Sequence, residues 1–239
     1  FPTRRSSDLQ SNPTEYYCQG NLEVKFKKFG PRSHTSITIM HLETLIYEQS
    51  EKVCIIKING PEALNAINNQ VFHDLFTVIE FVEKSKNVNV VSLTGQGQKS
   101  FAAGTDIKEM ESLSCSEARE FAVLARKSVD RIGTETTRMG QPEINLGVIP
   151  ESGGTQRLTR LIGGAKAAEL FTGKIIVAQT ALDSGLLNRI VASADLLKEA
   201  RAFASQFAEK STLTLALMKS AINTGNDLDL KSALGIVQK

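Results

Sequence analysis

The sequence predicts an α/β fold in which strands and helices alternate up to about residue 150 and helices predominate beyond it. Two apolar runs, residues 53–58 and 88–93, have the length of buried strands and are bounded by turn residues. Between them, apolar residues recur at steps of three and four over residues 71–82, which is the period of one helix face. Such alternation, followed by helices alone, is typical of an α/β core with a helical C-terminal region.

The expected elements follow one another along the chain. Strands are expected at residues 43–48, 53–58 and 88–93, and helices at residues 71–82, 114–133, 154–162, 165–171, 178–185, 194–208 and 213–222. The first two strands form a hairpin. Asn68 or Asn69 can cap the first helix, because a side-chain oxygen there can accept from a free backbone amide. Ser114 and Glu117 have the spacing of a capping box, and the apolar face that follows them continues to Gly133.

The chain divides into three expected segments: a disordered leader at 1–39, a core at 40–191 and a C-terminal helical region at 192–239. The leader lacks sustained periodicity, begins with Phe1 and is followed at once by Met40. We therefore expect it to be a translated flank outside the native fold. A transit peptide is the alternative, but Asp8 and Glu15 do not suit a basic amphipathic helix.

Composition restricts the class of partner. The chain has 28 basic and 26 acidic residues, a net charge of +2, which gives no electrostatic footprint for nucleic acid or for an anionic membrane. Its three cysteines show no CxxC spacing, which favours a reducing compartment. No apolar run approaches the roughly 18 residues of a membrane span. A soluble protein acting on a small molecule is expected.

The segment Ala103-Gly104-Thr105-Asp106 follows an apolar run and precedes an expected helix. Small residues and a glycine let the backbone approach a ligand closely, and outward-pointing amides can stabilise the negative oxygen of an enolate formed from a thioester. The alternative is an ordinary strand-to-helix turn that uses glycine for its geometry.

Glu143 lies between Pro142 and an apolar stretch at residues 144–149. Burial beside that stretch would favour the neutral acid, which could donate a proton to carbon as a general acid. A carboxylate at a strand edge in water is the alternative. The three histidines show no metal-ligand or triad spacing, and Gly95-Gln96-Gly97 is expected to be a turn.

Five motifs occur in the order and style of the crotonase superfamily, and the sequence resembles its enoyl-CoA hydratases and isomerases. They lie at residues 59–66, 101–110, 141–150, 153–158 and 178–189, and the resemblance covers roughly residues 43–239. It implies a crotonase (ClpP-like) spiral of ββα units with a C-terminal helical region. It also implies a lyase of fatty-acid β-oxidation or short-chain acyl-CoA metabolism, which adds water across the 2,3-double bond of an enoyl-CoA.

The same resemblance assigns roles to residues. Ala103 would supply one oxyanion-hole amide, and Glu143 would protonate the α-carbon. The acyl-CoA site would be lined by Ala63, Leu64, Ala103, Gly104, Thr105, Asp106, Ile107 and Pro142. No metal or redox cofactor is implied, because coenzyme A is part of the substrate. Relatives form trimers or hexamers, and we expect a cytoplasmic protein, with the mitochondrial matrix as the alternative.

This sequence departs from the family pattern at three places. A strand, a glycine-triplet turn and a helix, which carry the second oxyanion amide and the other catalytic glutamate, are missing where Thr134 joins Glu135. Glu135 lacks the glycine turn that would aim it and is not expected to replace that glutamate. The C-terminal helical region, which ends at Lys239, is expected to be truncated. Impaired activity is the expected consequence.

The third departure leaves two other functions open. Glu151 stands where typical hydratases carry a glycine-like residue, and some isomerases place a proton-shuttling acid there. An isomerase needs one carboxylate, so Glu143 or Glu151 could serve it without the missing glutamate. Glu151 could equally be a residue of a surface turn. A non-catalytic subunit that retains coenzyme A or partner binding is the remaining alternative.

Overall fold

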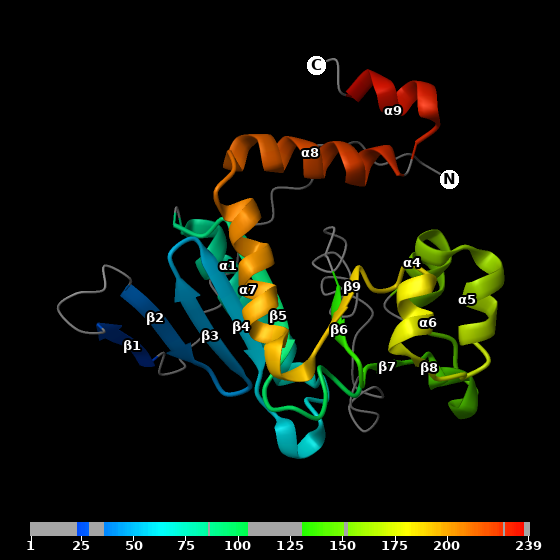
Figure 1. Ribbon diagram of the computed structural model, residues 1–239, viewed down its shortest axis with the longest axis horizontal. Helices are drawn as coiled ribbons and strands as arrows, with labels where there is room; N and C mark the ends of the chain where they lie inside the picture. Colours follow the sequence, from blue (N-terminus) through cyan, green and yellow to red (C-terminus); the bar gives the residue numbers. More distant parts are fainter. Residues whose placement is uncertain are drawn as a thin grey trace, which may run out of the picture.

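A computed structural model of the chain describes residues 23–28, 36–85, 87–104, 131–150, 153–226 and 228–236. Figure 1 shows a sheet on one side of the molecule, a group of short helices on the other, and helix α7 (Leu196–Ala208) lying across β4 and β5 of the sheet. Two further helices project beyond the end of the sheet.

The sheet has five strands in the order of the chain: β1 (Glu23–Lys28), β2 (Ser36–His41), β3 (Leu45–Ser50), β4 (Val53–Ile58) and β5 (Val90–Gly95). The first four strands pair antiparallel, and β5 pairs parallel with β4. Five of the six residues of β4 are buried, because this strand is covered on both faces of the sheet.

Helix α1 (Asn69–Lys84) covers one face of the sheet. Asn68 caps it by accepting a hydrogen bond from the Val71 amide at 2.9 Å. Its buried apolar side chains, Val71, Leu75 and Val78, belong to the same core cluster as residues of β2, β3 and β4. The predicted hairpin and the helix that follows it are confirmed.

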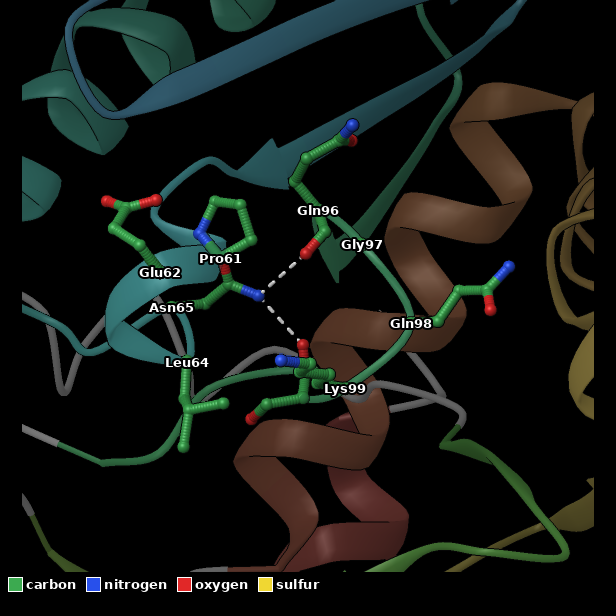
Figure 2. Close-up of a pocket in the computed structure, with 9 residues that line it drawn as sticks. Pro61, Glu62, Leu64, Asn65, Gln96, Gly97, Gln98 and Lys99 are labelled. Carbon is green, nitrogen blue, oxygen red and sulfur yellow. Dashed lines mark hydrogen bonds between the residues drawn. The ribbon is translucent and has the colours of Figure 1, made fainter.

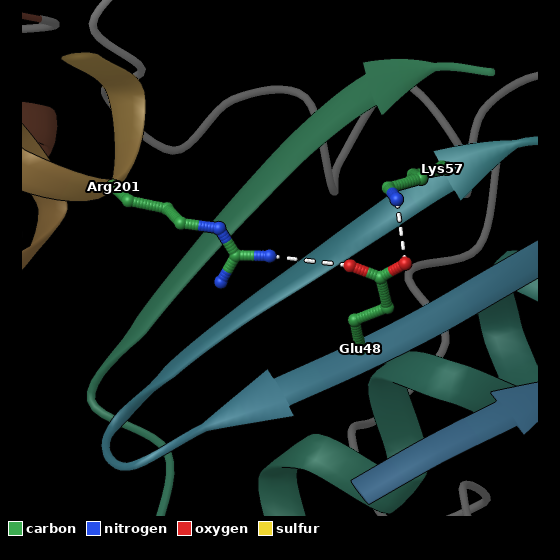
Figure 3. A network of polar contacts seen from close by, with 3 residues as sticks. All are labelled: Glu48, Lys57 and Arg201. Carbon is green, nitrogen blue, oxygen red and sulfur yellow. Dashed lines mark hydrogen bonds and ion pairs between the residues drawn. The ribbon is translucent and has the colours of Figure 1, made fainter. Parts of the chain in front are cut away.

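Helix α7 (Leu196–Ala208) covers the other face. Ala204 and Ala208 pack against Val53 and lie beside Val90. A polar network adds to this contact: Glu48 of β3 accepts from the Lys57 ammonium of β4 at 2.5 Å and from the Arg201 guanidinium of α7 at 3.2 Å (Figure 3). The network ties three elements together across the partly buried surface of the sheet.

The remaining elements form a second, smaller core. Strand β6 (Ile132–Thr134) pairs parallel with β9 (Arg189–Val191), and β7 (Arg138–Met139) pairs antiparallel with β8 (Ile176–Val177). Helices α4 (Gly154–Ile162), α5 (Gly164–Leu170) and α6 (Ala178–Asp183) lie beside them. Its buried residues are Leu170, Ile176, Ala181, Leu186 and Leu187.

Helices α8 (Thr212–Gly225) and α9 (Leu230–Ile236) contact one another at the C-terminal end of the described chain. Although α8 is rich in apolar side chains, none of its residues is buried. Leu213, Leu217, Met218 and Ile222 are exposed on α8, as are Leu230 and Leu234 on α9.

Two expectations about these elements differ from the structure. Residues 1–39 were expected to lie outside the fold, but β1 and most of β2 pair with the sheet; residues 1–22 and 29–35 lie outside the described part of the chain. Gly133 was expected to end a helix, but it lies inside β6. A distant strand accounts for the difference, because Gly133 pairs with Ile190 of β9. A glycine also fits there, since a Cβ would come within 2.6 Å of the Leu187 Cδ1. Within the described residues, no helix is long and apolar enough to cross a membrane.

Candidate functional site

A cavity of about 330 Å³ lies between two loops at the C-terminal ends of β4 and β5 (Figure 2). One loop contains the short 3-10 helix η1 (Pro61–Ala63), and the other is the turn at residues 96–100. The lining combines apolar and polar side chains: Pro61, Glu62, Leu64, Asn65, Gln96, Gly97, Gln98, Lys99 and Ser100. Loops beyond the carboxyl ends of parallel strands are a usual place for ligand binding in α/β folds.

Local sequence explains the shape of the first loop. Pro61 stands at the start of η1, where its missing amide is not needed and its ring sets the backbone angle. Leu64 and Asn65 then both adopt left-handed backbone angles, with φ of 55° and 57°. Asparagine tolerates this conformation and leucine does so at a cost, so the tight reversal depends on contacts around it.

Asn65 supplies those contacts. Its side-chain oxygen accepts from the Gly60 amide at 3.0 Å, and its side-chain nitrogen donates to the carbonyls of Gln96 at 3.0 Å and Ser100 at 2.8 Å (Figure 2). The side chain is 1% exposed. The two loops around the cavity are therefore joined through one buried amide.

The segment that follows the second loop returns to the first. The Ala103 amide donates to the Leu64 carbonyl at 3.0 Å, and the Ile67 amide donates to the Gly104 carbonyl at 2.9 Å. Gly104 has φ of 102°, a conformation that favours glycine. Leu64, Ala103 and Gly104 thus lie together beside the cavity.

One expected role differs from this geometry. The Ala103 amide was expected to be an oxyanion donor, but here it is already bonded to the Leu64 carbonyl. An amide has a single hydrogen to donate, so Ala103 is not presented as a free donor. Thr105, Asp106 and Ile107, the rest of this expected site, lie outside the described residues.

Glu143 lies in a different part of the molecule, within the 3-10 helix η2 (Pro142–Leu146). Pro142 opens that helix and is exposed, and Ile144 lies beside Gly173, after α5. With its nitrogen turned toward Glu143, the Gln141 amide donates to the two carboxylate oxygens at 3.1 and 3.3 Å.

The environment of Glu143 is more open than the sequence predicts. The side chain is only half-buried, and the apolar residues that were expected to wall it in are exposed: Ile144, Leu146, Val148 and Ile149. Of the two environments that the sequence allows for Glu143, burial beside an apolar wall is not found in this chain by itself. Glu151, the other expected acid, lies outside the described residues.

Glu135 has a structural contact. Its carboxylate accepts from the Ser193 amide at 2.9 Å and from the Ser193 hydroxyl at 3.0 Å, at the start of the 3-10 helix η3 (Ser193–Asp195). Hydrogen bonds from its own backbone amide and from Ser193 hold its pKa below the usual value. The carboxylate therefore caps the start of η3.

Other reactive groups are few in the described part of the chain. No cluster of His, Cys, Asp and Glu with the arrangement of a metal site occurs there. Burial raises the pKa of the Cys54 thiol to about 12, so at neutral pH this residue is an unreactive packing group.

Comparison with known proteins identifies the family. The family model described as enoyl-CoA hydratase/isomerase matches residues 48–132 and 128–238. The chain belongs to the enoyl-CoA hydratase/isomerase family. It is 36% identical to the short-chain-enoyl-CoA hydratase of Clostridium acetobutylicum, over 82% of this chain and 87% of that protein. It is 34% identical to the crotonyl-CoA hydratase of Syntrophomonas wolfei, over 82% of this chain and 88% of that protein.

Solved structures agree with this assignment. The enoyl-CoA hydratase of Bacillus anthracis superimposes with a TM-score of 0.75 at 28% identity, covering 84% of this chain and 88% of that one. One from Geobacillus kaustophilus gives the same TM-score at 30% identity, covering 81% and 86% of the two chains. The expected crotonase fold is confirmed.

The comparison with family members also shows where this chain differs from them. The two stretches matched by the family model meet at residues 128–132, ahead of the expected junction between Thr134 and Glu135. Since 82% of a 239-residue chain is about 196 residues, the 226 positions aligned with the Clostridium protein include about 30 at which this chain has no residue.

Sequence reasoning missed several residues of the cavity. Asn65 belongs to one of the family motifs, but its role as the bond between two loops depends on residues 31 and 35 positions away. The expected turn at Gly95-Gln96-Gly97 is confirmed, yet nothing in its composition predicts that it lines a cavity with Lys99. The available signal was an asparagine shortly after a Gly-Pro pair, which is typical of a turn that needs a left-handed residue.

Proposed function

We propose that this chain is an enoyl-CoA hydratase-like protein that binds an enoyl-CoA thioester beside the loops of η1 and residues 96–104. The observation that carries the proposal is its membership of the family, with relatives named short-chain-enoyl-CoA hydratase and crotonyl-CoA hydratase at about 35% identity. Addition of water across the 2,3-double bond is the proposed reaction, and coenzyme A enters with the substrate, with no further cofactor.

The proposed division of roles follows the chemistry of an enolate. Amides of the turn that begins at Ala103 stabilise the negative charge that develops on the thioester oxygen. The Ala103 amide can take this role only when its hydrogen bond to the Leu64 carbonyl is broken. Substrate binding would therefore be coupled to the breaking of that bond. Glu143 returns a proton to the α-carbon as general acid. Ala63, Leu64, Gly104, Thr105, Asp106, Ile107 and Pro142 are the proposed substrate contacts.

We propose further that the shortened segment impairs the reaction. The break in the family match at residues 128–132 supports this, as do the positions that lack a residue in the alignment. In the described part of the chain β5 is the last strand of its sheet, and its Val91 and Leu93 are exposed, where one more parallel strand would pack. Loss of one oxyanion donor costs about 10²–10³ in rate.

Isomerisation is the second candidate. It is favoured by the same shortening, because moving a double bond between positions 3 and 2 needs one carboxylate, and Glu143 or Glu151 would suffice. A non-catalytic subunit that binds a CoA thioester without turnover is the third candidate.

One set of assays separates these functions. Purified protein is given crotonyl-CoA, and loss of the absorbance of the conjugated thioester reports hydration. A 3-enoyl-CoA is given separately, and gain of that absorbance reports isomerisation. Glu143→Gln should abolish hydration. Isomerisation should be lost in Glu143→Gln or in Glu151→Gln, according to which carboxylate moves the proton. Glu80→Gln, an exposed change on α1, should leave either activity unaltered. Binding without either reaction would support the third function, and no binding would refute all three.

We also propose that the exposed apolar side chains of α8 and α9 pack against other copies in a trimer or hexamer. A helix with many apolar residues and none buried is typical of an interface. Light scattering should give a trimer or larger, and Leu217→Lys should shift it toward monomer. A monomeric wild-type protein would refute this part of the proposal.

A cytoplasmic location is proposed from the bacterial origin of the most similar relatives. A relative from Dictyostelium discoideum is named mitochondrial, so the matrix is the alternative in an organism with mitochondria. Fractionation of the source organism would distinguish the two.

A further inference from the structure

We propose that Asn65 is a positioning residue for the substrate site, because its buried side chain holds the η1 loop and the 96–100 turn in the arrangement that binds a CoA thioester. This inference rests on the proposed function and adds to it a residue that does not itself touch the reacting atoms.

The hydrogen-bonding capacity of Asn65 is directed at loop backbone. A primary amide has two N–H donors, and both are used, one on the Gln96 carbonyl and one on the Ser100 carbonyl. Its oxygen accepts from the Gly60 amide. Because the Asn65 side chain is buried, water would not replace it as the partner of these backbone groups if it were removed. An unpaired buried polar group costs more free energy than the hydrogen bond contributes.

The surroundings leave no room for a different arrangement. A Cβ added at Gly95 would lie 2.5 Å from the Asn65 nitrogen and 2.4 Å from the Ser100 carbonyl oxygen. A glycine is therefore needed at the end of β5 for the amide to reach both carbonyls. The end of β5 and the turn at 96–100 are fitted around this side chain (Figure 2).

The position of Asn65 carries its effect to the proposed site. Leu64 precedes it in the left-handed reversal, and the Leu64 carbonyl accepts from Ala103. Gly104 is joined to the same loop through Ile67, whose amide donates to the Gly104 carbonyl. By holding the 96–100 turn, Asn65 fixes the position from which residues 101–104 start. By holding the reversal at residues 64–65, it also fixes the Leu64 carbonyl, to which Ala103 donates.

The test uses Asn65→Asp, which keeps the size of the side chain and its acceptor for Gly60. The second oxygen then faces the carbonyls of Gln96 and Ser100, so both donated bonds are lost and replaced by repulsion. The affinity of the purified full chain for butyryl-CoA, a saturated thioester that cannot be hydrated, is measured by calorimetry. We expect about a 10- to 100-fold loss for this variant at neutral pH.

Lowering the pH should restore part of the affinity of Asn65→Asp for butyryl-CoA, which a general loss of stability would not do. A buried carboxyl facing carbonyl oxygens has a raised pKa, and its protonated form regains one O–H donor. The affinity of Asn65→Asp relative to wild type should therefore rise several-fold as the pH is lowered toward 5. The matched control is Asp74→Asn, the reverse exchange of carboxylate and amide at another buried position. Asp74 bonds to Thr44 and Gln70, away from the cavity. It should keep wild-type affinity within about twofold.

The outcomes are distinct. If wild type does not bind butyryl-CoA, the proposed function fails and this inference falls with it. If wild type binds and Asn65→Asp binds equally well, or if Asp74→Asn loses as much, the positioning role is refuted while the proposed function stands. If Asn65→Asp does not fold, Asn65→Gly, which suits the left-handed backbone, takes its place. Failure of both to fold would make Asn65 a folding residue and overturn the inference.

Discussion

Replacing Gly95 with alanine should destabilise this protein severely, because the added methyl group would clash with atoms that cannot move aside. Its Cβ would lie 2.4 Å from the carbonyl oxygens of both Phe101 and Ser100 and 2.5 Å from the Asn65 nitrogen. Two of these atoms belong to the backbone and the third to a buried, fully bonded amide, so none can move aside as a flexible side chain would.

The size of the effect follows from two contributions. Forcing a methyl group into a packed site costs about 1–3 kcal/mol. Displacement of the Asn65 amide would break its bonds to Gln96 and Ser100, each worth about 1 kcal/mol. The free energy of unfolding should thus fall by about 3–5 kcal/mol, a large part of the roughly 5–15 kcal/mol that stabilises a typical domain.

Urea denaturation followed by circular dichroism measures this change. The midpoint should fall by about 1–2 M with little change in the slope of the transition. Gly164→Ala is the matched control, because the nearest atom to a Cβ there is 4.0 Å away and alanine favours the helix that Gly164 begins. If Gly95→Ala is as stable as Gly164→Ala, the close packing around Asn65 is refuted.

Three further results are expected. Asn68→Ala should lower the free energy of unfolding by about 1 kcal/mol in thermal denaturation, because the Val71 amide loses its cap; an unchanged melting temperature would contradict the cap. Glu135 has a lowered pKa, so its contribution is present above its ordinary value of 4.5 and is lost as the pH falls through the lowered value. The free energy of unfolding, measured by urea denaturation, should therefore fall less between pH 5 and pH 3 in Glu135→Gln than in wild type. An equal fall in both proteins would exclude the bond to Ser193. Cys54, in a variant lacking the other two cysteines, should react with a thiol reagent at pH 8 only after denaturant is added, and labelling of the folded protein would contradict its burial.

Elements that depend on local signals could be predicted from the sequence. Helix α1 has both a cap and a continuous apolar face, and Asn68 is one of the two caps that the sequence allows. Strand β4 is apolar at every position except Lys57, so its burial was expected. Helices α4 to α8 follow their apolar periods within a few residues, because each packs or projects as a separate amphipathic segment.

Properties that depend on distant residues could not be predicted. The bond between Ala103 and Leu64 joins parts of the chain nearly 40 residues apart and gives no local pattern. The apolar stretch after Glu143 indicated burial, but apolar composition does not determine which segment covers it, and here Ile149 is 75% exposed. Pairing of β1 with β2 was missed because residues 1–39 lack a sustained period.

The contact between α7 and the sheet bears on how the chain is made. Arg201 and Glu48 are 153 residues apart in the sequence, and Val53 and Ala204, which also contact one another, have a similar separation. At a synthesis rate of about 5–20 residues per second, roughly 8–30 seconds pass after the strands leave the ribosome before α7 is available. During that time α1 can already cover its own face of the sheet, while the face that α7 will cover stays open to solvent. A nascent chain of this protein therefore exposes the sheet face that carries Val53, Val90 and Glu48 until its last quarter has been translated.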